Sequence, residues 1–189
     1  MTGAPPLLVG LVSDTHGLFD PRLRDLFSGC GLILHAGDVV RRPVLEELRR
    51  IAPVRAVRGN NDLGPEFEDL PEIAVVGVGD VTAVLVHQVG TPEHPYPEVR
   101  RALSRHRASL LVFGHSHRPL ASLRDGILHV NPGSAGPRRF RLPRSAGLIE
   151  LHGSAAEVRL VDLASPDLSL LEPALRCELG GEGAGARRW

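Results

Sequence analysis

The chain has 189 residues, of which 42% are hydrophobic and 23% charged, an ordinary composition for a globular protein with a full core. Its formal net charge is zero, so no global basic field requires nucleic acid as a partner. No apolar run approaches the roughly 20 residues that span a bilayer. The distant Cys30 and Cys177 indicate neither a disulfide framework nor a thiolate metal site. With no basic leader before the first strand, we expect a cytoplasmic protein.

The first part of the chain predicts strands that alternate with helices. The expected order is a strand over residues 7–13, a helix over 19–27, a strand over 32–36, a helix over 43–51 and a strand over 54–57. The continuous apolar run of the first strand is typical of a strand that is buried on both faces. This βαβαβ order implies parallel strands joined by right-handed crossovers.

After Asp62 the pattern changes to short strands with one more helix. Runs over 73–78 and 81–87, joined at Gly79-Asp80, predict an antiparallel hairpin. A helix over 97–106 and a strand over 110–113 follow, and then a meander-like run of strands over 120–123, 127–130, 147–151 and 157–163. We therefore expect residues 1–165 to form a single domain of two packed sheets flanked by helices, and residues 166–189 to form a partly flexible extension.

Five short segments, each directly after an apolar run, carry side chains that bind metals. They are Asp14-Thr15-His16, Gly37-Asp38, Gly59-Asn60-Asn61-Asp62, His87 and Gly114-His115-Ser116-His117. In an open α/β sheet the residues past the carboxyl ends of the strands converge on one crevice. We therefore expect seven ligands to meet there: Asp14, His16, Asp38, Asn60, His87, His115 and His117. Such nitrogen and oxygen donors suit two divalent cations, and two cations that share a carboxylate and a water make a phosphoester hydrolase.

The spacing of the ligands supports a pair of metal ions. Asp14 and His16 stand two residues apart, as do His115 and His117, so at an extended strand end each pair would point the same way. Asp38 could place one oxygen on each of two ions roughly 3.5–4 Å apart. A lone histidine at a strand end is more often structural, so the prediction depends on the conjunction of all five segments.

The series D-x-H, G-D, G-N-x-D, H and G-H-x-H resembles the calcineurin-like metallophosphoesterase superfamily. The short chain and the segment Asn131-Pro132-Gly133-Ser134 resemble its small YfcE-type phosphodiesterase branch, over roughly residues 7–163. The resemblance implies a four-layer αββα sandwich of two mixed β-sheets flanked by helices. It also implies a first metal held by Asp14, His16, Asp38 and His117, and a second held by Asp38, Asn60, His87 and His115.

The same resemblance implies a two-metal-dependent phosphoesterase that hydrolyses phosphodiester bonds with a metal-bridging hydroxide as the nucleophile. The expected cofactors are two divalent ions, with Mn²⁺ as the first choice and Fe, Zn, Co or Ni also compatible with the donors. The expected catalytic residues are Asp38, Asn60, Asn61 and Asp62, and the expected substrate-binding residues are Asn61, Gln88 and His94. Asp62 would orient Asn60 or Asn61.

Two positions depart from the superfamily pattern. Many members have a histidine after Gly-Asn that protonates the leaving group, whereas Asn61 cannot act as a general acid. The missing acid favours phosphodiesters over phosphomonoesters, and it leaves His94 either as a substitute acid or as an exposed loop residue. Gln88 stands where the superfamily usually has glycine, and it could narrow the pocket or contact the substrate.

Two other functions are compatible with this fold. A non-catalytic scaffold would resemble a eukaryotic retromer subunit that works through its surfaces, but a scaffold is free to lose ligands and all seven positions are filled here. A nuclease is disfavoured by the neutral charge and by an aromatic content of 4%. We therefore expect a small phosphodiester as the partner, with neither nucleic acid nor membrane. A homo-oligomer formed through an edge strand or a helix stays open.

Overall fold

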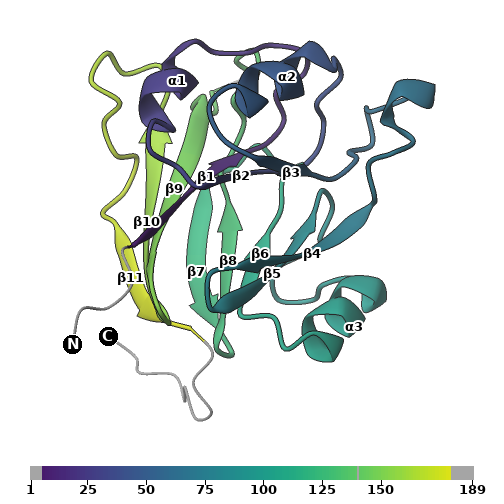
Figure 1. Ribbon diagram of the computed structural model, residues 1–189, viewed down its shortest axis with the longest axis vertical. Helices are drawn as coiled ribbons and strands as arrows, with labels where there is room; N and C mark the ends of the chain where they lie inside the picture. The colour runs from purple at the N-terminus through teal and green to yellow at the C-terminus, as the bar shows by residue number, and fades with distance from the viewer. Residues whose placement is uncertain (1–5, 140, 180–189) are drawn as a thin grey trace.

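The computed structural model describes residues 6–139 and 141–179, which form two β-sheets with helices on their outer faces (Figure 1). The first sheet contains β1 (Leu7–Val12), β2 (Leu32–His35), β3 (Val54–Ala56), β9 (Ser145–His152), β10 (Ala155–Asp162) and β11 (Leu175–Glu178). The second contains β4 (Ile73–Val78), β5 (Val81–Val86), β6 (Leu110–Val112), β7 (Leu120–Arg124) and β8 (Ile127–Asn131). The helices are α1 (Arg22–Leu26), α2 (Pro43–Arg49), the 3₁₀ turn η1 (Pro65–Phe67) and α3 (Pro97–Arg105).

The first sheet has the strand order β11-β10-β9-β1-β2-β3. Strands β1, β2 and β3 are parallel, as the βαβαβ order predicted, with Val9 opposite Leu32 and Ile33 opposite Val54. On its other side β1 pairs antiparallel with β9, which places Leu11 opposite Gly147. The first sheet is therefore mixed, and β1 is an interior strand.

The second sheet has the order β4-β5-β6-β8-β7. The predicted hairpin of β4 and β5 is confirmed, while β6 lies parallel to both β5 and β8. The predicted meander over the later strands is wrong in part. Strands β7 and β8 join the second sheet, whereas β9, β10 and β11 join the first, because hairpin signals are local and do not specify the sheet to which a hairpin adds.

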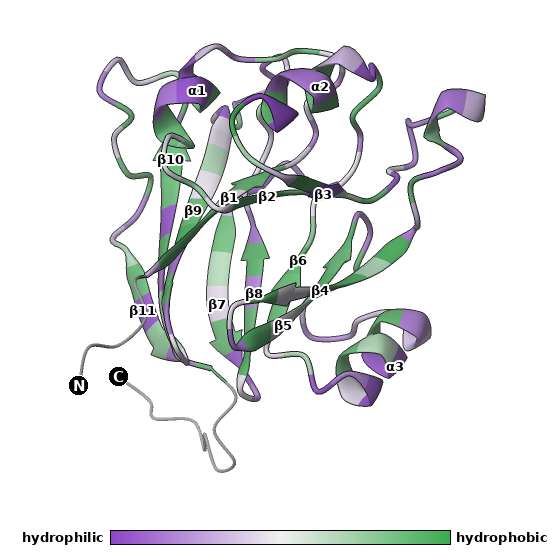
Figure 2. Ribbon diagram, in the orientation of Figure 1, coloured by the Kyte–Doolittle hydropathy of each residue, from purple (hydrophilic) through white to green (hydrophobic). Residues whose placement is uncertain are grey.

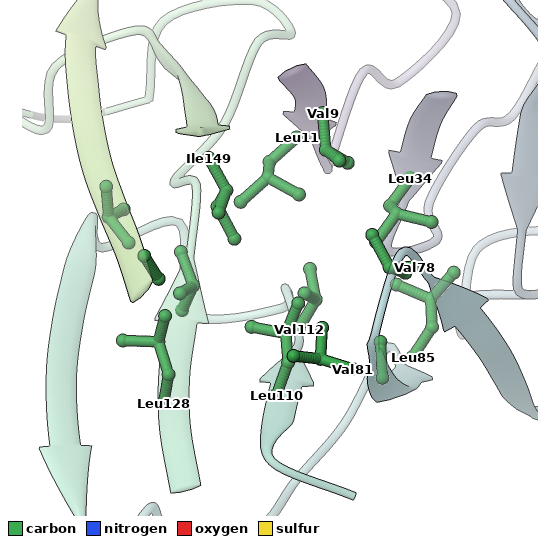
Figure 3. Close-up of a cluster of buried hydrophobic side chains, with 14 of the residues drawn as sticks. Val9, Leu11, Leu34, Val78, Val81, Leu85, Leu110, Val112, Leu128 and Ile149 are labelled. Atoms are coloured by element: carbon green, nitrogen blue, oxygen red, sulfur yellow. The ribbon is translucent and has the colours of Figure 1, made fainter. Parts of the chain in front are cut away.

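Three hydrophobic clusters hold the layers together. The largest lies between the sheets, where Leu11 and Leu34 of the first sheet face Leu85 and Leu110 of the second (Figure 3). A second cluster packs α1 and α2 on the first sheet, and a third packs α3 on the second. Figure 2 shows the matching pattern, with hydrophobic residues concentrated on the strands. The predicted four-layer αββα sandwich is confirmed.

The C-terminal part adds one strand that the sequence did not predict. Strand β11 pairs antiparallel with β10 and places Cys177 opposite Ala156, so residues 175–178 belong to the first sheet. Residues 180–189, which make up much of the predicted flexible extension, lie outside the described residues.

In the part of the chain that the structure describes, no helix is long and apolar enough to cross a membrane.

Candidate metal centre

The loops that follow five strands bring the predicted ligands together. Asp14 and His16 follow β1, Asp38 follows β2 and Asn60 follows β3, all in the first sheet. His87 follows β5, and His115 and His117 follow β6, in the second sheet. The site therefore lies where the two sheets meet, and each sheet supplies part of the ligand set.

A first group of ligand atoms is formed by Asp14, His16 and His117, which lie within 4.8 Å of one another. The Nε2 atom of His117 is 3.0 Å from Asp14 Oδ1 and 3.3 Å from His16 Nε2. Asp14 is fully buried, and its Oδ1 has no hydrogen-bond partner among the described residues. A buried oxygen without a partner is costly, so its position beside two imidazole nitrogens fits a bound cation.

The other oxygen of Asp14 is already occupied. Its Oδ2 accepts hydrogen bonds from Ser13 Oγ at 2.5 Å and from the backbone N–H of His115 at 3.1 Å. These two bonds fix the carboxylate and leave Oδ1 as the atom that faces the histidines.

A second group combines Asp38 and His87 with Asn60 and His115. Asn60 Oδ1 lies 3.0 Å from both His87 Nε2 and His115 Nδ1, and His87 Nε2 lies 3.4 Å from Asp38 Oδ1. The ring Nδ1 of His87 donates to the carbonyl of Ala36 at 2.7 Å. Because that nitrogen carries a proton, Nε2 is the atom free to bind a cation.

Burial lowers the pKa of His87, but Asp38 and Asp14 outweigh burial and raise it above its ordinary value. A proton on Nε2 therefore competes with a metal ion for the same lone pair. The proton and the metal ion are both positively charged, so the carboxylates of Asp38 and Asp14 favour the binding of either one.

Asp38 lies between the two groups. Its Oδ2 is 3.8 Å from His16 Nε2, and its Oδ1 faces His87. Asn61 donates to both oxygens, from its backbone N–H at 2.8 Å and from Nδ2 at 2.6 Å. Burial alone would raise the pKa of Asp38, but His87 and Asn61 together hold it below its ordinary value. Asp38 is therefore a carboxylate with one oxygen turned toward each group.

Five of the ligands have a left-handed backbone, a feature that the sequence did not predict. Positive φ angles occur at Asp14 (52°), His16 (45°), Asp38 (57°), His115 (69°) and His117 (57°). The expectation that these pairs lie on extended strand ends is wrong, because β1 ends at Val12 and β6 at Val112. Such backbone costs about 1 kcal/mol or more per residue and persists only where the surroundings impose it.

Asp62 holds two of the ligand loops together. It is 2% exposed, and its oxygens accept the backbone N–H groups of Val40 at 2.6 Å and Gly59 at 2.7 Å. The sequence placed Asp62 among the catalytic residues and expected it to orient the side chain of Asn60 or Asn61. The structure instead joins it to the backbone of the loops after β2 and β3.

Two of the three predicted substrate-binding residues, Gln88 and His94, lie in different surroundings. Gln88 Nε2 is 3.1 Å from Asn60 Oδ1 and 3.3 Å from His115 Nδ1, so it lies among the second group. His94 is exposed on a loop, where its backbone N–H donates to Thr91 Oγ1. Among the described residues, no hydrogen bond or ion pair joins the His94 ring to the ligands.

Two buried residues support the ligands in ways that sequence reasoning left open. Asn131 is fully buried and donates from Nδ2 to Gly114 O at 2.9 Å and to Ser116 Oγ at 3.0 Å. His35 is also fully buried, and burial lowers its pKa to about 4. It accepts a hydrogen bond from Gly37 N at Nδ1 and lies 3.1 Å from Thr15 Oγ1, so it fixes the loops after β1 and β2 as a neutral ring.

Positive charge lies at the rim of the first group. Burial lowers the pKa of His16, and the guanidinium of Arg139 lowers it further. The effect of Arg139 exceeds the opposite effect of Asp38. The positive charge of Arg139 therefore opposes protonation of the His16 ring.

The fold and the donors define a metal-binding αββα protein whose site draws ligands from both sheets. Residues 7–154 match the family model of the calcineurin-like phosphoesterase superfamily domain, and the chain belongs to this family. A relative described as "Probable metallophosphoesterase", from Methanocaldococcus jannaschii, is 33% identical in an alignment of 135 positions that covers 68% of this chain and 68% of that protein. Phosphodiesterase YfcE of Escherichia coli is 31% identical over 157 residues, covering 73% of this chain and 84% of the enzyme.

Solved structures show the same fold in proteins of different kinds. A predicted phosphoesterase from Streptococcus pneumoniae aligns with a TM-score of 0.72 and 23% identity, over 93% of this chain and 99% of that one. Vacuolar Protein Sorting 29 from Cryptosporidium parvum aligns with a TM-score of 0.75 and 24% identity, over 93% of this chain and 100% of that one. Both structures are less than 25% identical to this chain, so they show the fold alone.

Proposed function

We propose that this metallophosphoesterase-family protein is a two-metal-dependent phosphodiesterase. Asp14, His16, Asp38 and His117 would hold the first ion, and Asp38, Asn60, His87 and His115 the second. The observation that carries the proposal is Asp14 Oδ1, a buried oxygen with no hydrogen-bond partner among the described residues, facing the Nε2 atoms of two histidines. Mn²⁺ is our first choice, and the donors also suit Fe, Zn, Co and Ni.

When bound, two such cations would lower the pKa of a water that serves as the hydroxide nucleophile and would neutralise charge on the phosphoryl oxygens. The residues of the chain then have a mainly positional task. Asn61 fixes both oxygens of Asp38, and Asp62 fixes the loops that carry Asp38 and Asn60. For this reason we assign Asp62 a positioning role.

The position after Asn60 restricts the leaving group. The side-chain amide of Asn61 donates to Asp38 Oδ2, and an amide has no proton to transfer at neutral pH. A substrate whose leaving group departs without protonation should therefore react best, as aryl esters do. The proposed preference for diesters over monoesters is supported by the name of the phosphodiesterase relative from Escherichia coli.

A scaffold is the alternative that a specific observation favours, because Vacuolar Protein Sorting 29 shares the fold. A scaffold has no need of a complete ligand set. The short contacts among the seven predicted ligands and the left-handed backbone at five of them support the enzyme. Backbone strain of this kind is typical of functional sites, which supports the enzyme.

The test is to strip the protein of metal, add Mn²⁺ back, and compare hydrolysis of bis(p-nitrophenyl) phosphate with that of p-nitrophenyl phosphate. We expect metal-dependent turnover that favours the diester, two bound ions per chain, and loss of turnover in Asp38→Asn. Asp80→Asn, in the exposed β4–β5 turn, is the matched control and should behave like the wild type. A protein that binds no metal would refute the proposal and favour the scaffold.

A further inference from the structure

Three backbone segments lie side by side at the rim of the first group. The segment 14–17 bonds on one side to residues 37–39, through Asp14 N to Gly37 O at 3.0 Å and Gly17 N to Val39 O at 2.8 Å. On its other side, Gly136 N donates to Asp14 O at 3.0 Å. Residues that follow 39 and 136 therefore flank His16 from opposite sides.

On the first side, Arg41 lies against Gly17. A Cβ atom on Gly17 would be 3.0 Å from the Cγ and Cδ atoms of Arg41, so the absence of a side chain there lets the arginine cross the backbone next to His16. Arg41 is exposed, and its guanidinium is available to solvent.

On the second side, the backbone before Arg139 is firmly held. A Cβ atom on Gly136 would lie 2.5 Å from Asp14 O, which shows how closely this loop packs. Arg144 donates to Gly136 O, to Ala135 O and to the buried carboxylate of Asp20. These three bonds anchor the start of the loop, and exposed Arg139 follows three residues after Gly136.

No ion pair of the described residues neutralises Arg41 or Arg139, which are among the eleven of twenty described arginines without one. Ion pairs occupy nine of the arginines in the described ranges: Arg22, Arg24, Arg42, Arg50, Arg58, Arg124, Arg144, Arg159 and Arg176. Arg41 and Arg139 take part in none of the ion pairs of residues 6–139 and 141–179. Arg41 and Arg139 thus each carry a charge that no ion pair compensates, on the two segments that flank His16.

We propose that Arg41 and Arg139 form a subsite for a second phosphate, so that the preferred substrate is a phosphodiester that carries a further phosphate group. The inference rests on the proposed function, which assigns the scissile phosphate to the metal ligands. The guanidinium is a planar donor that matches phosphate oxygens in a bidentate manner. The guanidinium groups of Arg41 and Arg139 lie outside the predicted ligand set, so they provide hydrogen-bond donors for a phosphate other than the scissile one.

The test uses two substrates that differ only in this phosphate: thymidine 5′-(p-nitrophenyl phosphate) and the same compound with a 3′-phosphate. For the wild type we expect kcat/KM to be about 10-fold higher with the 3′-phosphate, the effect of one charge-assisted contact. In Arg41→Gln and Arg139→Gln this ratio should fall toward one. Arg101→Gln, on the exposed face of α3 and in no ion pair of the described residues, removes the same charge elsewhere and should keep the wild-type ratio.

A binding measurement separates this inference from the proposed function. The dissociation constants of thymidine 3′,5′-bisphosphate and thymidine 5′-phosphate are compared by calorimetry on the Mn²⁺-loaded protein and on the same variants. If neither diester is hydrolysed, the proposed function fails, while the bisphosphate preference still tests the subsite. Equal affinity for the two ligands in the wild type would overturn the inference. So would an equal proportional loss on both substrates in the variants, because it would place the arginines on the scissile phosphate.

Discussion

Replacing Asn131 with aspartate would remove the support of the loop that carries His115 and His117. The two side chains have nearly the same shape, but a carboxylate cannot donate the bonds that Nδ2 makes to Gly114 O and Ser116 Oγ. Both histidines have left-handed backbone, so the loop depends on such bonds to keep its geometry. We expect Asn131→Asp to weaken both the fold and the metal site.

The magnitude follows from burial. Asn131 and Gly114 are buried, so the change leaves a carbonyl without its donor and places a carboxylate beside it. An unsatisfied buried group costs about 1–3 kcal/mol, so we expect a loss of about 3 kcal/mol in the free energy of unfolding. For a domain of this size that loss lowers Tm by about 6–12 °C. A disturbed support of metal ligands weakens metal affinity by about 10-fold to 100-fold.

The assay is thermal unfolding near pH 8, where the new carboxylate is ionised, together with calorimetric titration of Mn²⁺. Ser116→Ala is the comparison variant, because it removes the acceptor of one Nδ2 bond and keeps the bond to Gly114 O, and it should cost about 1 kcal/mol. If Asn131→Asp melts within about 2 °C of the wild type and binds Mn²⁺ with unchanged affinity, the positioning role is refuted.

Three further predictions follow from the site. Burial lowers the pKa of His35 to about 4, so between pH 6.5 and pH 4 this histidine is protonated in the unfolded state but mostly neutral in the folded state. The free energy of unfolding should therefore fall as the pH drops below 6.5, by about 2–3 kcal/mol at pH 4.5. Urea unfolding of His35→Gln should show a smaller pH dependence, and an unchanged one would contradict this role. Gln88→Ala removes the donor to Asn60 Oδ1, so the second Mn²⁺ should bind about 3-fold to 10-fold more weakly while the first is unaffected, and a calorimetric titration with equal effects on both ions would argue against it. Mn²⁺ at a hundredfold excess over its Kd should stabilise the protein by about 3 kcal/mol per ion, and a Tm that is the same with Mn²⁺ and with a chelator would exclude binding to the folded state.

The sequence predicts well those parts of the fold that local patterns determine. The strands from β1 to β6 follow largely apolar runs, and the β4–β5 hairpin follows its turn at Gly79-Asp80. The pairing of β9 with β1 depends on residues far apart in the chain, and no local pattern encodes it. Strand β11 has only four residues, each half-buried or exposed, so its hydrophobic pattern is too weak to predict a strand.

For the site, the sequence predicts which residues come together as candidate ligands but not how they are held. Asp14, His16 and Asp38 can be predicted because their chemistry and their place after strands are both visible in the sequence. Their left-handed backbone cannot be predicted, since these residue types adopt it only when neighbouring segments impose it. The same applies to Asp62, whose role is defined by two backbone N–H groups in different loops.

The pairing of β1 with β9 also determines when the protein can fold. Strand β1, which positions Asp14, lies in the interior of its sheet only after residues 145–152 have taken their place beside it. Contacts between residues so distant in sequence give a fold of high contact order, which forms slowly because the chain entropy is lost before the contacts form. During synthesis, a nascent chain that has emerged as far as His117 already contains every ligand but still lacks the strand that completes the sheet. The ribosome therefore releases the binding residues long before it releases the segment that makes them a site.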